Sequence, residues 1–295
     1  MSMVSPSLPS GFTFSQSSLQ DYSDCPRRFQ LRYIEQLQWP AVEMEPALEN
    51  ERRQMEGQLF HRLVQQHLIG LPAGKLTRLA NTHNLSRWWE NYLGSKFELS
   101  GYALYTELTL AAPVGSYRLV AKYDLIAVKP GARAFIYDWK TTQKRPRDEW
   151  MAARMQTRVY RAMLVQAGAA LNGGISFHPE QIEMIYWYAD YPSEPARFLF
   201  NTAQHTRDWD ALTGLINEIG NHRHFPLTED EKKCAYCPYR SYCNRGGKAG
   251  MIPSGEMADV VVPDPAGQFR FQDGARETEL TGTEINFEQI AEIEF

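Results

Sequence analysis

A short apolar segment that ends in two opposite charges constrains the fold of this chain more than any other feature. Residues 135–137 (Phe-Ile-Tyr) are apolar, as in a buried strand, and Asp138, Trp139 and Lys140 follow them directly. Side chains alternate between the two faces of a strand, so Asp138 and Lys140 point the same way. Such a pair indicates either a surface ion pair on an edge strand, which contributes little energy, or a site for a metal and a phosphate.

The bulk composition places the chain among globular proteins. It has 295 residues, of which 43% are hydrophobic and 12% aromatic. Its first residues lack the basic and apolar pattern of a secretory signal, and no stretch is long enough to span a membrane. We therefore expect a soluble cytoplasmic protein without a membrane partner.

Charge is distributed unevenly along the chain. Ten acidic residues and two arginines lie after Gly250, which leaves 29 Lys+Arg and 25 Asp+Glu in residues 1–250. The body is therefore mildly basic, which permits a polyanionic partner without requiring one. The tail, residues 251–295, contains short apolar runs that are compatible with a strand-forming appendage, an acidic disordered tail or a partner-binding segment.

The hydrophobic period changes along the chain and predicts an α/β fold. Helical spacing predicts helices from Ser15 to Tyr33 with a kink at Pro26, and then over residues 45–69, 85–97, 150–171 and 209–222. Alternating or apolar runs predict strands over residues 102–111, 117–128, 134–141, 183–189 and 197–201. The first three strands are separated by Pro/Gly turns and form an antiparallel meander. This order predicts a mixed central sheet flanked by helices.

Asp124 lies on the strand before the opening segment, where it can approach Asp138. Two carboxylates at short range repel each other unless a cation lies between them. A divalent ion with oxygen ligands removes that conflict, polarises a phosphodiester and acidifies its bound water, while Lys140 neutralises the developing charge. The alternative is that both acids are solvated ends of strands.

Two helices carry polar residues four positions apart, which lie on one helix face. Gly57 and His61 occupy the helix before the strands, where His61 is either a third metal ligand or a core histidine. Gln156 and Tyr160 occupy the helix after Lys140. They face either solvent or a nucleic-acid strand, with Tyr160 able to stack on a base.

The cysteines indicate a metal centre instead of disulfides. Cys234, Cys237 and Cys243 form a C-x2-C-x5-C cluster, and Cys25 is the only other cysteine. Four thiolates suit an iron–sulfur cluster as well as zinc. The alternative is a buried thiol at Cys25 and a separate zinc knuckle completed by the histidine at position 222 or 224. The segment Gly70–Leu76 lacks phosphate-loop spacing, so we expect no ATP partner.

Taken together, these motifs resemble the PD-(D/E)XK nuclease superfamily, and specifically its RecB-like branch with an iron–sulfur cluster. The matches run in order through Cys25-Pro-Arg-Arg-Phe29, Gly57-Gln-Leu-Phe-His61, Asp124, Asp138-Trp-Lys140, Gln156-Thr-Arg-Val-Tyr160 and Cys234-x2-Cys237-x5-Cys243. Each motif is weak alone, but six in order are specific. Two positions depart from the pattern: Asp138 replaces the commoner Glu, and Ala121 stands where Gly is frequent.

The resemblance implies roles for these residues. His61, Asp124, Asp138 and the Trp139 backbone carbonyl would bind Mg2+ or Mn2+, and Lys140 would position the attacking water. Gln156 and Tyr160 would contact DNA. Cys25 and the three distal cysteines would hold a 4Fe-4S cluster, with Zn2+ as the alternative, and so join the N- and C-terminal segments.

The resemblance also implies a restriction-endonuclease-like core and a DNA substrate. We expect a nuclease domain over residues 1–250, with an inner core over about 45–200, and an appendage over 251–295. The expected activity is that of a metal-dependent exonuclease on single-stranded or unwound DNA ends. It would act in repair, recombination or CRISPR spacer processing, with proteins of those pathways as partners. The alternative function is a non-catalytic DNA-binding module with a structural metal cluster.

Overall fold

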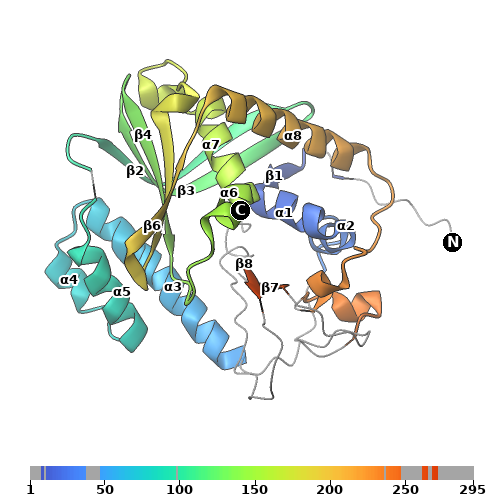
Figure 1. Cartoon of the computed structure of the whole chain (residues 1–295), viewed down its shortest axis with the longest axis horizontal. Helices are drawn as coiled ribbons and strands as arrows, with labels where there is room; N and C mark the ends of the chain where they lie inside the picture. The colour runs from blue at the N-terminus through green and yellow to red at the C-terminus, as the bar shows by residue number, and fades with distance from the viewer. Residues whose placement is uncertain are drawn as a thin grey trace. The chain divides into compact units, whose positions relative to one another are not determined.

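The structure of the chain is a computed structural model that describes residues 8–9, 11–37, 47–97, 99–235, 237–246, 261–264 and 268–271. The chain divides into two compact units (Figure 1). The larger unit contains residues 11–16 and 55–219, and the smaller unit contains residues 1–10, 17–54 and 220–295. Within the described residues, no helix is long and apolar enough to cross a membrane.

The larger unit is organised around a mixed sheet. Its strands are β1 (Thr13–Ser15), β2 (Ala103–Val114), β3 (Tyr117–Lys129), β4 (Arg133–Lys140), β5 (Ile182–Tyr188) and β6 (Tyr191–Leu199). They follow the order β1-β3-β4-β5-β6, and β2 also pairs with β3. The β1–β3 and β4–β5 pairs are parallel, and the others are antiparallel. The predicted mixed sheet and antiparallel meander are confirmed, whereas β1 is too short to show a period in the sequence.

Six of the eight α-helices in the described residues accompany this sheet. They are α3 (Ala47–Leu68), α4 (Ala73–Thr77), α5 (His83–Gly94), α6 (Asp148–Ala153), α7 (Met155–Ala167) and α8 (Thr202–Asn221). They belong to the larger unit, except for the start of α3 and the last two residues of α8. Two 3-10 turns, Ala169–Asn172 and Pro179–Gln181, precede β5.

The single helix expected over residues 150–171 is wrong. Arg154 adopts an extended backbone (φ −64°, ψ 146°), which separates α6 from α7. The Thr157 hydroxyl donates a hydrogen bond to the Met151 carbonyl near the end of α6. The same carbonyl accepts a 3.3 Å bond from the Arg154 backbone N–H, so the end of α6 closes on itself instead of continuing into α7.

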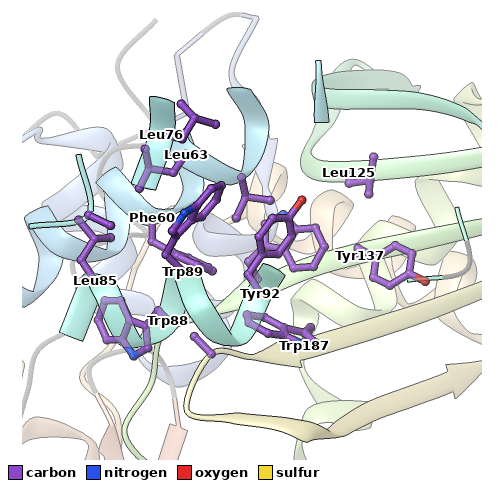
Figure 2. Packing of buried hydrophobic residues seen from close by; sticks show 14 of the residues in the cluster. Phe60, Leu63, Leu76, Leu85, Trp88, Trp89, Tyr92, Leu125, Tyr137 and Trp187 are labelled. Carbon is purple, nitrogen blue, oxygen red and sulfur yellow. The ribbon is translucent and has the colours of Figure 1, made fainter. Parts of the chain in front are cut away.

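An aromatic core covers one face of the sheet (Figure 2). Phe60 of α3 stacks on Trp187 of β5 at 6.0 Å between ring centroids, and Tyr92 of α5 lies edge-on to Trp139 of β4 at 5.9 Å. Trp139 and Trp187 are buried in this cluster with α3 and α5. Because side chains alternate, Asp138 points to the opposite face of β4, where α7 packs.

The smaller unit begins with a helix that is interrupted after Asp24. Its elements are α1 (Gln16–Asp24), α2 (Pro26–Phe29), a π-helix (Gln30–Ile34) and two 3-10 turns (Glu231–Cys234 and Arg240–Cys243). The kink predicted at Pro26 is confirmed, since Cys25 has an extended backbone and Pro26 starts α2. In the tail, β7 (Val261–Asp264) pairs antiparallel with β8 (Gln268–Phe271). The remaining tail positions lie outside the described residues.

Candidate active site

The register of the sheet brings Asp124 and Asp138 together. The antiparallel ladder between β3 and β4 reaches Leu125 and Tyr137, so the two aspartates occupy the next position on each strand. One Asp124 oxygen, Oδ2, accepts a hydrogen bond of 2.8 Å from the Trp139 backbone N–H. The interpretation as a surface ion pair on an edge strand is wrong, because β4 lies between β3 and β5 and Asp138 is only 3% exposed.

Asp138, Lys140 and Gln156 form a closed triangle of polar contacts. Lys140 Nζ lies 2.8 Å from Asp138 Oδ2 and donates to Gln156 Oε1 at 3.2 Å. Gln156 Nε2 donates to Asp138 Oδ1 at 2.7 Å. Since Lys140 is 9% exposed and Gln156 5% exposed, the triangle is nearly closed to solvent. Gln156 therefore orients the two charged groups, a role that its sequence position alone did not predict.

His61 completes the acidic side of this arrangement from α3. Its Nδ1 lies 3.4 Å from Asp124 Oδ2, and both side chains are about one-fifth exposed, at 20% and 18%. The larger unit thus brings together five of the predicted site residues: His61, Asp124, Asp138, Lys140 and Gln156.

The environment moves the pKa values of the two aspartates in opposite directions. Burial, followed by the negative charge of Asp124, raises the pKa of Asp138 to about 6 even though Lys140 opposes the shift. Burial also acts to raise the pKa of Asp124, but His61 and the hydrogen bond from Trp139 overcome it and hold that pKa below its usual value. Neighbouring titratable groups whose pKa values are shifted in opposite directions in this way are typical of functional sites.

Tyr160 does not have the surroundings expected for base stacking. Its ring is 1% exposed and lies 4.8 Å from the Tyr123 ring between centroids. The Tyr123 hydroxyl also donates to the Tyr160 backbone carbonyl at 2.9 Å. We therefore correct the expectation that Tyr160 offers an open face to a base: its ring packs α7 onto β3.

Tyr186 of β5 is a neighbour of the site that sequence reasoning missed. Its hydroxyl lies 2.8 Å from Thr157 Oγ1 and 3.5 Å from Gln156 Oε1. The Lys140 ammonium lies 5.4 Å from the centroid of its ring. One signal in the sequence could have revealed it. Tyr186 and Tyr188 are two positions apart in a strand that is buried along its whole length, so both point to one face of the sheet.

The four cysteines lie in the smaller unit as free thiols. Cys25 precedes α2, while Cys234 and Cys243 each end a 3-10 turn. Burial raises the pKa of Cys237 to about 11, the nearby Cys25 and Cys234 thiols add to that shift, and Arg28 opposes it. Thiols that raise one another's pKa are chemically suited to sharing a cation.

Other observations bear on the metal predictions. His222 Nδ1 lies 2.5 Å from the Tyr22 hydroxyl, so that nitrogen of the alternative zinc ligand is already engaged. No three histidine, cysteine or acidic side chains in the described part of the chain are arranged ready to hold a metal ion. The donor chemistry nevertheless fits the expected groups: paired carboxylates beside His61 for a divalent ion, and four thiols for a cluster.

Comparison with known proteins gives a family match and loose likenesses to several solved structures, two of which follow. The model of the PD-(D/E)XK nuclease superfamily matches residues 13–244. A comparison with curated proteins gives no match. The crystal structure of SSO0001 has 15% identity and a TM-score of 0.34, over 78% of this chain and 85% of that one. A candidate exonuclease from Eubacterium rectale has 9% identity and a TM-score of 0.44, over 70% of this chain and 79% of that one.

These structural likenesses are too loose to support an argument, whereas the family match spans most of the sequence and both units. It includes the strands that carry Asp124, Asp138 and Lys140, the helix that carries Gln156, and all four cysteines. By that match, the chain belongs to the PD-(D/E)XK nuclease superfamily.

Proposed function

We propose that the chain is a metal-dependent DNA exonuclease of the RecB-like branch, which hydrolyses phosphodiester bonds at single-stranded or unwound ends. The observation that carries the proposal is the buried triangle of Asp138, Lys140 and Gln156. Burying charged groups costs free energy even when they are paired, so a protein gains little stability from such an arrangement. Placed beside Asp124 in a nuclease superfamily member, the triangle supports a catalytic role.

The acidic side of the site fits a divalent ion. Asp138 has a raised pKa because burial and the Asp124 charge both disfavour its ionised form. We propose that His61, Asp124, Asp138 and the Trp139 backbone carbonyl hold Mg2+ or Mn2+. Such an ion would supply Lewis-acid chemistry and lower the pKa of bound water.

Lys140 and Gln156 contribute positioning and charge. The ammonium of Lys140 lies between Asp138 Oδ2 and Gln156 Oε1 at 2.8 Å and 3.2 Å, which restricts its movement. A fixed positive charge beside the scissile phosphate stabilises negative charge as it develops, without reorganisation during the reaction. We assign Lys140 this role and the positioning of the attacking water, and Gln156 the positioning of Lys140.

For the smaller unit we propose a 4Fe-4S cluster held by Cys25, Cys234, Cys237 and Cys243, with Zn2+ as the alternative. The pKa shifts of the thiols support proximity but do not distinguish the metals. Visible absorption at roughly 400 nm would separate iron–sulfur from zinc. The cluster would join the two ends of a nuclease domain over residues 1–250, with its inner core at about 45–200 and residues 251–295 as an appendage.

The wider setting is also part of the proposal. Repair, recombination or CRISPR spacer processing would supply DNA ends, and proteins of those pathways would be the partners. The alternative function, a DNA-binding module without catalysis, would not require a buried lysine between an aspartate and a glutamine.

The test is cleavage of end-labelled single- and double-stranded DNA with Mg2+, Mn2+ and other divalent ions in turn. We expect metal-dependent shortening from an end, and its loss in Lys140→Ala. Lys75→Ala is the matched control, because Lys75 is exposed on α4. Purified protein with intact metal centres that cleaves no DNA would contradict the enzyme and favour the binding module.

A further inference from the structure

Tyr188 occupies the last position of β5, next to the proposed catalytic strand. The parallel register between β4 and β5 pairs Asp138 with Tyr186 and Lys140 with Tyr188. Directly paired residues in a sheet point to the same face. Both tyrosines therefore lie on the face that carries the aspartate and the lysine, opposite the aromatic core.

The Tyr188 hydroxyl is buried without a hydrogen-bond partner among the described residues. The residue is 0% exposed, and its hydroxyl oxygen is likewise inaccessible. Two positions earlier, the Tyr186 hydroxyl has Thr157 Oγ1 at 2.8 Å. A buried hydroxyl without a partner costs free energy, and the great majority of buried polar groups avoid that cost. Tyr188 is thus an exception located in the candidate active site.

Two cationic side chains lie near this tyrosine. Burial raises the pKa of Tyr188, while the charges of Lys140 and Arg145 are close enough to oppose that shift. The Arg145 guanidinium carbon lies 5.5 Å from the centroid of the ring. Arg145 is held in place by the Glu194 carbonyl and by Asp148, both at 2.7 Å. The phenol therefore remains protonated at neutral pH and is a hydrogen-bond donor in the neighbourhood of two cationic side chains.

We propose that Tyr188 is a further catalytic residue, whose hydroxyl donates a hydrogen bond to a non-bridging oxygen of the DNA phosphate beside Lys140. This inference rests on the proposed function. Water adds to phosphorus and the bond to the leaving oxygen breaks, which produces a phosphate monoester and an alcohol. One proton of the water is lost to solvent and the leaving oxygen gains one, while the phenol keeps its own proton. The hydrogen bond strengthens as negative charge grows on the phosphate.

The first experiment compares Tyr188→Phe with Tyr186→Phe. We expect Tyr188→Phe to lower kcat about 10- to 100-fold, with KM changed less than about threefold, because the donor acts mainly in the transition state. Its melting temperature should equal or exceed that of the wild type, since a buried polar group without a partner is removed. Tyr186→Phe should lower the melting temperature, because the Thr157 hydroxyl loses one of its two hydrogen-bond partners.

A second readout uses single phosphorothioate substitutions at the scissile position, with Mn2+ as the metal for both proteins. Sulfur accepts hydrogen bonds weakly, so the wild type should cleave one of the two diastereomers more slowly. In Tyr188→Phe the difference in cleavage rate between the two diastereomers should become smaller. Removal of a hydroxyl with only a structural role would leave this difference unchanged.

Two results would overturn the inference about Tyr188. One is an unchanged kcat in Tyr188→Phe with a lowered melting temperature, which would make the hydroxyl structural. The other is an unchanged phosphorothioate preference in that variant. In either case the proposed function stands, provided that the wild type cleaves DNA and Lys140→Ala does not. If the wild type cleaves no DNA, the proposed function and this inference both fail.

Discussion

The two candidate sites of this chain are built in different ways. In the larger unit, Asp138 and Lys140 come from one strand, and the sheet register adds Asp124 from the next strand. In the smaller unit, Cys25 and Cys234 are 209 positions apart in the sequence and lie at the ends of short helical segments. Hydrogen bonding between neighbouring strands therefore positions the residues of the first site. The cysteines of the second site come from segments that are far apart in the sequence.

The electrostatic states of the two sites also differ. In the larger unit a positive group already lies beside the buried acid, since Lys140 is 2.8 Å from Asp138. In the smaller unit burial raises the pKa values of Cys234, Cys237 and Cys243, which favours their neutral form. Metal binding to thiols releases their protons and couples to folding. We therefore expect the charged site to be stable without a metal, and the thiol site to depend for its stability on the metal proposed there.

The largest expected effect is on the thiol site. If the four thiols hold the proposed metal centre, Cys25→Ser should remove it and lower the free energy of unfolding by about 3 kcal/mol or more, because structural metal binding is part of the folding free energy. Metal analysis, visible absorption and thermal melting measure these changes. Lys75→Ala is the control, because Lys75 is exposed on α4 and its replacement should leave the metal content and the melting temperature unchanged. Unchanged metal content and melting in Cys25→Ser would contradict a shared four-thiol site.

The next effect concerns the positioning of Lys140. Gln156→Ala should lower kcat about 10- to 100-fold, because a displaced catalytic group loses its productive geometry. Gln166→Ala is the matched control, since Gln166 is exposed near the end of the same helix α7. Single-turnover cleavage measures the chemical step. Equal rates for the two variants would show that the triangle does not position the lysine.

A third effect is a pH dependence of metal binding at the charged site. The pKa of Asp138 is raised to about 6, so the carboxyl is protonated below that pH and competes with a cation. Affinity for Mn2+ should fall up to about tenfold for each pH unit below 6 and level off above 7. Titration calorimetry at several pH values measures the constants. The Mn2+ affinity that remains in Asp138→Asn should no longer show this fall below pH 6. If the pH dependence is unchanged in that variant, another group is responsible for it.

The smallest expected effect lies on the strand next to Asp124. Glu107 has a left-handed backbone with φ of 52°, and the ladder between β2 and β3 skips it, running from Thr106–Leu125 to Leu108–Tyr123. Glu107→Gly should raise the free energy of unfolding by up to about 1 kcal/mol, because glycine adopts this conformation without strain.

The control for that prediction separates charge from backbone conformation. Glu107 also pairs with Lys122 at 2.9 Å, a contact that Glu107→Gln removes without altering the backbone. This variant should change stability by less than about 0.5 kcal/mol, because exposed ion pairs contribute little. Glu107→Val should destabilise, since a β-branched residue disfavours a positive φ. Urea unfolding measures the free energy of unfolding of all three variants. A lower stability of Glu107→Gly would contradict the idea that the backbone of Glu107 is strained.

Much of the architecture followed from local patterns in the sequence. Alternation placed Asp138 and Lys140 on one face of a strand, and the meander brought Asp124 beside them. Pro26 marked the break after α1, because proline lacks the amide hydrogen that a continuous helix requires. These features depend on the few residues around each position, so a single sequence contains them.

The tertiary structure decided which polar groups are buried and what they contact. Gln156 and Tyr160 lie on one helix face, yet Gln156 contacts the charged pair and Tyr160 packs against Tyr123. The break at Arg154 and the buried hydroxyl of Tyr188 have no signature in hydrophobic period. Local sequence patterns were enough to predict the antiparallel meander of β2, β3 and β4 and the charged pair on β4. The contacts of these residues depend on packing between elements that are distant in the sequence. Burial and hydrogen bonding are set by those neighbours, which local residue spacing does not specify.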